Sequence, residues 1–176
     1  MSSRKIVYTS LTIIILFFAF LITATLAPAE YKGSITEEFP DQQIDIWKNL
    51  ISLDAILLRK PDVERIEVVE EDRDGIVWIE YLKNGQKRTL RVVERNAPNY
   101  IVIDTIQADN NFVGRWSYSL NQESDKKKTQ VTIEEESYNA NFWLRGWHTM
   151  LGRSVNLRRE IKSLRVSLFQ RLLTTP

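Results

Sequence analysis

The sequence predicts an α+β domain, a seven-stranded antiparallel sheet with a long C-terminal helix, preceded by one N-terminal transmembrane helix. Residues 6–29 form a run of 24 residues without a charge. Seven segments with strand-like alternation lie between residues 31 and 138, and connections of hairpin length join the last six. Residues 141–172 then place apolar side chains at helical spacing.

Residues 1–29 are predicted to be a membrane anchor that precedes a domain of residues 30–176. The helical stretch 6–26 would extend about 32 Å, which matches the hydrocarbon core of a bilayer. Its strongly apolar positions include Ile6, Leu16, Phe17, Phe18 and Leu26. Globular-core helices rarely stay apolar on all faces for this length.

A cleaved signal peptide is the alternative interpretation of the same segment. Arg4 and Lys5 form a basic start, and Ala27-Pro28-Ala29 resembles a cleavage site of small residues. The apolar stretch is long for a signal peptide, which favours the retained anchor. The positive-inside rule then places the N-terminus in the cytoplasm and the domain on the extracytoplasmic side of the cell membrane, which is the periplasm if the cell is a Gram-negative bacterium.

Within the domain, a strand comes first, two helices follow, and six strands lead to the final helix. Pro40 and Asp41 favour a helix start, and Ser52 can cap the short second helix that ends before Pro61. The predicted strands are 31–39, 63–70, 76–82, 87–94, 99–106, 114–120 and 129–138. In the last helix, two apolar stripes fall out of phase near Gly152, which predicts a kink there.

Asn84-Gly85 is a strong hairpin signal between two of these strands. If the loop has two residues, Val77 opposes Val92 and Ile79 opposes Leu90. That register predicts that Val77, Ile79 and Tyr81 point to the inner face of the sheet.

The order of elements and several motifs resemble those of the helix-grip proteins, also called START-like or SRPBCC proteins, and in particular their polyketide cyclase/dehydrase and lipid transport branch. The motifs are Phe39-Pro40-Asp41 followed by Ile46-Trp47, the strand 62–68, Asn84-Gly85, and Gly114-Arg115-Trp116-Ser117-Tyr118. The resemblance implies a curved sheet that grips the long helix, with an apolar cavity between them. It also implies functions that range from lipid carriage to cyclase chemistry.

Residues that face inward on the predicted strands and final helix are the candidates to line this cavity. They are Val77, Ile79, Tyr81, Leu90, Val92, Ile101, Ile103, Trp116, Tyr118, Ile133, Trp147 and Leu151. The alternative for each is an ordinary place in the hydrophobic core.

Composition excludes several classes of site. The chain has no cysteine and a single histidine, His148, so thiolate metal sites and a Ser-His-Asp triad have little support. We expect no metal, no cofactor and no catalytic constellation. A net charge of +1 gives no signature of nucleic-acid binding.

Residues 141–176 carry seven basic residues and one acidic residue. This basic stretch could bind anionic lipid headgroups or an acidic partner, or it could be a solvated face that complements the helix dipole. The leading hypothesis is a membrane-anchored protein that binds a lipid or another hydrophobic molecule. The alternatives are a non-catalytic single-span subunit that stabilises a larger membrane complex, and a cyclase-like enzyme that uses Tyr81, Tyr118 or Glu135.

Overall fold

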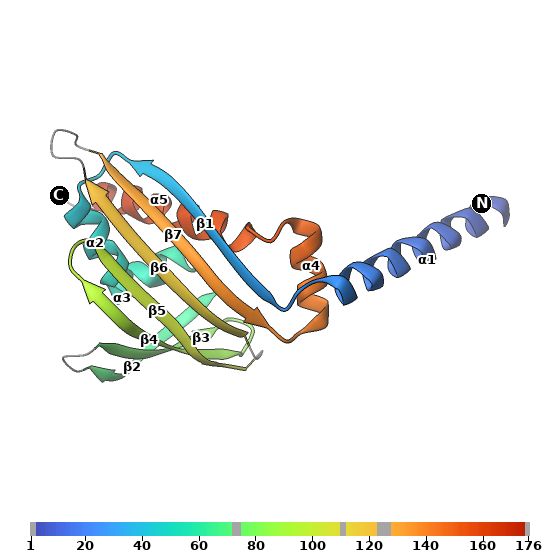
Figure 1. The fold of residues 1–176 in the computed structure, drawn as a ribbon, viewed down its shortest axis with the longest axis horizontal. Helices are drawn as coiled ribbons and strands as arrows, with labels where there is room; N and C mark the ends of the chain where they lie inside the picture. Colours follow the sequence, from blue (N-terminus) through green and yellow to red (C-terminus); the bar gives the residue numbers. More distant parts are fainter. Residues whose placement is uncertain (1–2, 72–74, 110–111, 123–127, 175–176) are drawn as a thin grey trace.

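The computed structural model describes residues 3–71, 75–109, 112–122 and 128–174. Figure 1 shows a curved sheet with helices against one face and a long helix that projects from one end. The elements in chain order are α1 (Ser3–Leu26), β1 (Glu30–Phe39), α2 (Gln43–Ile51), α3 (Leu53–Arg59), β2 (Val63–Glu71), β3 (Ile76–Leu82), β4 (Lys87–Asn96), β5 (Tyr100–Ala108), β6 (Phe112–Gln122), β7 (Thr129–Asn139), α4 (Phe142–Leu151) and α5 (Val155–Thr174).

The seven strands form one antiparallel sheet in the order β1-β7-β6-β5-β4-β3-β2, which confirms the predicted sheet. From β2 to β7 each strand pairs with the next one along the chain, and β1 closes the order beside β7. Irregularities in the register interrupt the pairing of β2 with β3 and of β4 with β5. Such bulges bend a strand and increase its twist, so they help this half of the sheet to curve.

Helix α5 covers the concave face beside β1 and β7. Its buried side chains recur at helical spacing and belong to the same core as residues of the sheet and of α2. Those of α5 are Leu157, Ile161, Leu164 and Leu168. Trp47 of α2 lies in this core, as its motif predicts, and the buried Ser167 donates a hydrogen bond to Asn49 Oδ1 at 2.9 Å.

The prediction of one continuous C-terminal helix is wrong, because the chain breaks it into α4 and α5. Gly152 follows α4 with φ of +92°, a conformation that ends a helix and that favours glycine. The phase slip between the two apolar stripes therefore marks a break rather than a kink. As a result α4 leaves the concave face and turns toward α1.

The predicted register of the β3–β4 hairpin is also wrong, by one residue. Trp78 opposes Leu90, and Glu80 opposes Arg88. The amide of Leu82 donates to the carbonyl of Gln86, so the loop holds three residues, and Gly85 has φ of +83°. A three-residue loop with a left-handed glycine is a common hairpin form, and the extra residue moves every β3 side chain to the opposite face.

Helix α1 is the long projecting helix of Figure 1. Its segment Val7–Leu26 is long and apolar enough to cross a membrane, and only 6% of the most apolar window is buried. It is therefore not the core helix of a globular domain. Leu16, Phe17, Phe18 and Leu26 are exposed; the side chain of Ile6 lies outside the described part of the chain.

The C-terminal end of α1 packs against α4. The ring of Phe20 stacks on Trp143, with centroids 5.6 Å apart, and lies 5.5 Å from the ring of Trp147. Gly146 makes this close approach possible, because a Cβ at its position would come within 2.7 Å of the Ala24 Cβ and within 2.9 Å of the Phe20 ring. Ala24 is fully buried there.

Arg153, in the segment between α4 and α5, fixes the link from α1 to the sheet. Its Nη2 donates to the carbonyl of Pro28 at 3.0 Å and to the carbonyl of Glu30. Its guanidinium also lies over the ring of Tyr31, 5.2 Å from the centroid. The break after α4 thus supplies the residue that holds α1 in place.

We predict that Gly146→Leu will separate α4 from α1. The added side chain has no space against Ala24 and Phe20, and overpacking of this kind costs about 1–3 kcal/mol. Amide hydrogen exchange of the full chain in detergent should therefore become roughly tenfold faster in α4. Met150→Leu, on an exposed position of the same helix, is the control and should leave exchange unchanged. Unaltered protection of α4 in Gly146→Leu would contradict this packing.

Candidate functional site

A cavity of about 300 Å³ lies between the sheet and the helices, where α5 does not cover the concave face. The inner faces of β3 to β6 form one wall, and α3, α4 and α5 contribute the others. Its volume is at the lower end of the range for small-molecule sites. The residues that line it include Ile56, Arg59, Lys60, Trp78, Arg88, Leu90, Ile103, Thr105, Ala108, Trp116, Tyr118, Leu144, His148, Asn156, Arg159 and Glu160.

The sheet supplies an apolar, largely aromatic wall. Trp78, Leu90 and Ile103 come from three neighbouring strands, and all three are buried in the core cluster. Trp116 packs against the same cluster from β6. Inward-facing residues of adjacent antiparallel strands lie side by side, so these four form a continuous surface that can bury an apolar ligand.

An ion-pair network centred on a buried carboxylate adjoins this wall. Glu80 of β3 is fully buried, and its carboxylate accepts from Lys60 Nζ at 2.8 Å and from Arg88 Nε at 2.6 Å. Trp78 Nε1 also donates to it at 3.3 Å. Burial alone would raise the pKa of Glu80, but the charges and hydrogen bonds of Lys60 and Arg88 lower that pKa to about 2. The network fixes the side chains of Trp78 and Arg88 at the cavity.

Tyr118 and Glu160 form a polar pair across the cavity. The Tyr118 hydroxyl donates to Glu160 Oε1 at 3.0 Å and so links β6 to α5. Burial raises the pKa of Tyr118 well above its ordinary value, and the negative charge of Glu160 adds to that effect. Tyr118 therefore stays a neutral donor at physiological pH.

Arg59, at the end of α3, is the cavity residue with unfilled hydrogen-bonding capacity. Its side chain is 4% exposed, and Nη2 donates weakly to the carbonyl of Leu50 at 3.4 Å. Nε and Nη1 are buried without a hydrogen-bond partner in the described part of the chain. Its positive charge opposes the rise in the pKa of Tyr118 that burial and Glu160 cause.

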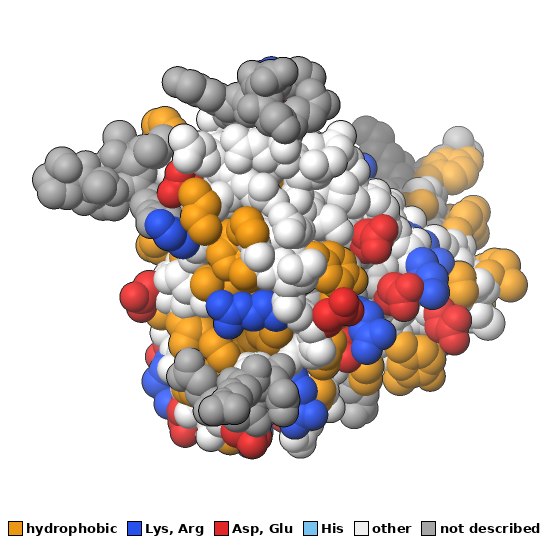
Figure 2. Space-filling view, turned by 60° about the vertical axis from the view of Figure 1, so that its left-hand side comes forward, with side chains coloured by type: hydrophobic (Ala, Val, Ile, Leu, Met, Phe, Trp, Pro, Cys, Tyr) orange, Lys and Arg blue, Asp and Glu red, His pale blue; other side chains and the backbone are white. Residues whose placement is uncertain are grey.

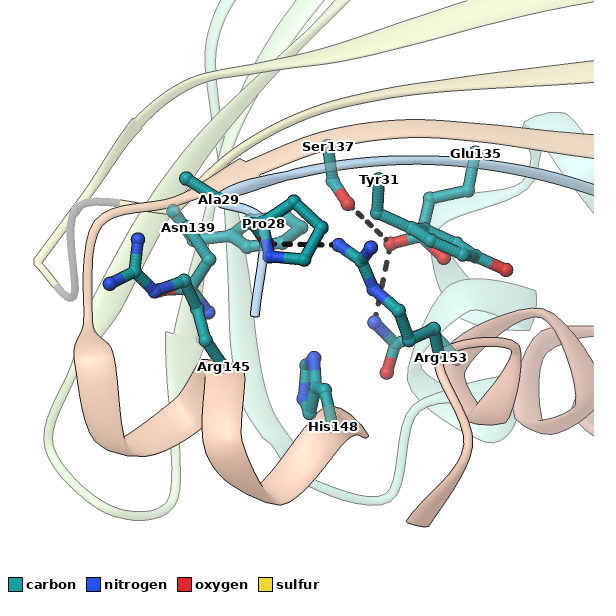
Figure 3. A pocket seen from close by; sticks show the side chains of 11 residues that line it. Pro28, Ala29, Tyr31, Glu135, Ser137, Asn139, Arg145, His148 and Arg153 are labelled. Carbon is teal, nitrogen blue, oxygen red and sulfur yellow. Dashed lines mark hydrogen bonds between the residues drawn. The ribbon is translucent and has the colours of Figure 1, made fainter. Parts of the chain in front are cut away.

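A second, smaller cavity of about 20 Å³ lies where α1 joins the sheet (Figure 3), with room for one water molecule. Glu135 of β7 is buried in its wall and accepts from Ser137 Oγ at 2.9 Å and from Asn156 Nδ2 at 3.2 Å. Burial raises the pKa of Glu135, whereas the two hydrogen bonds oppose the rise. Arg145 and His148 project from α4 toward this cavity.

His148 lies between the two cavities and lines both. Burial lowers its pKa, and the charges of Arg153 and Arg159 lower it further, so the imidazole is neutral at physiological pH. Among the described residues no group of three His, Cys, Asp or Glu side chains could hold a metal ion. His148 is thus a neutral polar side chain in the wall of both cavities.

The basic residues near the C-terminus make different contacts in different parts of the domain. Arg153 holds the α1 link, Arg159 lines the large cavity, and Arg165 forms an ion pair with Glu37 of β1. Figure 2 brings forward the end of the domain opposite α1, where acidic and basic side chains are interspersed. These observations favour the solvated interpretation of the basic stretch over a single anion-binding surface.

The structure divides the twelve predicted cavity residues into four groups. Four of them line the large cavity: Leu90, Ile103, Trp116 and Tyr118. Three are buried in the core without lining that cavity: Val92, Ile101 and Ile133. Three lie on the face of β3 opposite to Trp78: Val77, Ile79 and Tyr81. Trp147 and Leu151 are 52% and 62% exposed on α4. Whether any of the twelve contacts a ligand stays a prediction.

Two causes account for the misplaced positions. The one-residue shift in register turns Trp78 inward in place of its neighbours Val77 and Ile79. The break after α4 turns Trp147 and Leu151 away from the concave face. Sequence reasoning also missed Arg59, Lys60 and Arg88, because a charged residue at a helix end or strand start is usually solvated. One sequence feature points to these residues: the basic pair Arg59-Lys60, followed by Pro61, ends a short apolar helix.

The arrangement of sheet, cavity and helix was compared with known proteins. An aromatase/cyclase, Zhui from Streptomyces sp. R1128, has a TM-score of 0.67 and 12% identity over 81% of this chain and 96% of its own. Norcoclaurine synthase from Thalictrum flavum has a TM-score of 0.59 and 10% identity over 88% and 92% of the two chains. This chain has the SRPBCC helix-grip fold.

A further similar structure is the di-domain aromatase/cyclase StfQ of the steffimycin biosynthetic pathway, with a TM-score of 0.63 and 11% identity over 82% of this chain and 52% of that one. No family model and no curated protein matches the sequence. At such identities the likeness establishes the fold and leaves activity to the site itself.

We predict that Glu80→Gln will destabilise the domain by about 3 kcal/mol, because loss of the carboxylate leaves Lys60 and Arg88 without a buried partner. The matched control is Glu67→Gln, which removes the exposed Arg65–Glu67 pair and should cost less than about 1 kcal/mol. Urea unfolding of the full chain, followed by tryptophan fluorescence, measures both. Equal losses in the two variants would contradict a structural role for the buried network.

The same carboxyl predicts an acid-dependent loss of stability. Its folded-state pKa of about 2 lies below the ordinary 4.5, so the unfolded chain takes up the proton first. The stabilisation is complete above about pH 4.5 and is lost as pH falls toward 2. Urea unfolding at several pH values should therefore show a steeper decline in wild type than in Glu80→Gln. Parallel pH profiles would exclude Glu80 as the source.

Proposed function

We propose that this protein is a membrane-anchored binding protein for a lipid or another hydrophobic small molecule, held in the cavity between the sheet and the C-terminal helices. The observation that carries the proposal is the 300 Å³ cavity itself, with Trp78, Leu90 and Trp116 in its wall. Burial of a ligand against these side chains would contribute about 25 cal/mol per Å² of apolar surface.

Membrane attachment is supported by α1. Its apolar residues are exposed along most of the helix, which in water would be a large unfavourable apolar surface. The packing of Phe20 and Ala24 on α4 favours retention over cleavage, since removal of residues 1–29 would uncover Trp143, Gly146 and Trp147. With Arg4 and Lys5 before the span, the domain lies on the extracytoplasmic side.

Helix α4 connects the anchor to the cavity. Trp143 and Trp147 contact Phe20 of α1, whereas Leu144 and His148 of the same helix line the cavity. Trp143, Trp147, Met150 and Leu151 are all more than half exposed. Tryptophans beside the end of a membrane span are typical of the headgroup region. This arrangement supports a cavity that opens close to the bilayer, where an apolar ligand is abundant.

Binding is a better-supported proposal than catalysis for this chain. The three similar structures described above are named as two aromatase/cyclases and one synthase, but the three groups that the sequence suggests for cyclase chemistry do not meet in this chain. Tyr118 lines the large cavity, Glu135 lines the small one, and Tyr81 donates to Glu67 at 2.9 Å on the outer face of β3. General acid–base chemistry needs its groups within hydrogen-bond reach of one substrate.

The test is ligand retention by a variant with a filled cavity. Ala108 of β5 lines the cavity, so Ala108→Trp should occupy much of its volume. Ile106→Trp places the same side chain at an exposed position of the same strand and is the matched control. The full-length proteins would be purified in detergent and their extracted small molecules identified by mass spectrometry.

We expect one class of lipid or other apolar molecule to be enriched with wild type and with Ile106→Trp, and to fall at least about fivefold with Ala108→Trp. Circular dichroism would show that the filled variant retains its fold. Equal recovery from all three proteins, or no enriched molecule from any of them, would overturn the proposal.

A further inference from the structure

We propose that the cavity is specific for an acidic amphiphile, whose carboxylate or phosphate head binds Arg59 and whose apolar chain lies against Trp78 and Trp116. This inference rests on the proposed function and names the class of ligand. The proposal rests on the buried guanidinium of Arg59, a residue that lines the cavity and whose Nε and Nη1 have no hydrogen-bond partner among the described residues.

The first step is the state of Arg59 itself. A guanidinium is always charged in proteins. Arg59 as a whole residue is only 4% exposed. An ionised group removed from water without a compensating charge costs several kcal/mol. The single weak hydrogen bond to the carbonyl of Leu50 does not compensate this cost.

The second step is that the neighbouring carboxylates are already engaged. Glu80 already accepts hydrogen bonds from both Lys60 and Arg88, so its carboxylate has no capacity left for Arg59. Glu160 accepts a hydrogen bond from the Tyr118 hydroxyl, and no ion pair joins it to Arg59 within the described residues. Arg159, Lys87 and Asp62 complete the charged residues that line the cavity. Arg59 is thus the buried cation that an incoming anion would neutralise.

The third step is the distribution of polar and apolar groups. Arg59 and Lys60 lie at the end of α3, whereas the aromatic wall of Trp78, Leu90 and Trp116 belongs to the sheet. One compact charged group beside a broad apolar surface matches a molecule with one charged head and an extended chain. A carboxylate or phosphate oxygen accepts charge-assisted hydrogen bonds from guanidinium nitrogens, which are about twice as strong as neutral ones.

Matched amphiphiles test this inference. Radiolabelled laurate, dodecyl phosphate and dodecanol share one twelve-carbon chain and differ in the head. Their binding to the full chain in phosphatidylcholine nanodiscs would be measured at pH 7.5, with partition into empty nanodiscs subtracted. Inorganic phosphate serves as a fourth probe and distinguishes a lipid head from free phosphate.

Arg59→Met is the informative variant, because it keeps much of the side-chain length and removes the charge. Arg91→Met is its control, at an exposed position between the inward-facing Leu90 and Val92 of β4. Removal of an uncompensated buried charge should leave the thermal midpoint of ligand-free Arg59→Met equal to or above that of wild type. A purely structural arginine would instead lower it.

We expect wild type and Arg91→Met to bind laurate or dodecyl phosphate at least about tenfold more tightly than dodecanol. In Arg59→Met that preference should vanish, with dodecanol affinity within about threefold of wild type. Equal binding of all three amphiphiles to wild type would contradict the specificity for an acidic head group and would leave the proposed function unaffected. If inorganic phosphate binds as tightly as dodecyl phosphate, the apolar chain does not contribute to binding, and an amphiphile as the ligand is contradicted. Failure of every amphiphile to bind would overturn both proposals.

Discussion

The concave face of the sheet is wider than one helix can cover, and the cavity follows from that mismatch. Leu157, Ile161 and Leu164 of α5 fill the side near β1 and β7. The other side, toward β3 and β4, is closed by α3 and by side chains at the helix ends. Because close packing is the rule in protein interiors, a space of about 300 Å³ lined by aromatic residues is the feature that most needs a functional explanation.

The break between α4 and α5 decides where that cavity lies relative to α1. A single straight helix would have kept Trp143 and Trp147 near the sheet, with α1 unsupported. With Gly152 in the left-handed region, α4 turns to α1, and Gly146 lets the two helices approach closely. The same short helix then presents Leu144 to the cavity and Trp143 to α1, so it connects the apolar N-terminal helix to the cavity.

Periodicity was enough to predict the seven strands, their antiparallel arrangement and the basic outline of the fold, because each strand carries its own alternation. It failed where one residue decides the outcome. Asn84-Gly85 is compatible with loops of two or three residues, and the third residue moves Trp78 inward and Tyr81 outward. Arg59 was unpredictable for another reason: its burial depends on how α3 packs over the sheet, which no local pattern around residue 59 contains.

The central claim is that a ligand occupies the space between β3–β6 and the helices. An experimental structure of the full chain, purified from its native membrane into nanodiscs without added ligand, tests it most directly. The account predicts continuous elongated density along Trp78 and Trp116, with one end in contact with Arg59. A collapsed cavity filled by the protein's own side chains, with Arg59 turned out to solvent, would contradict it.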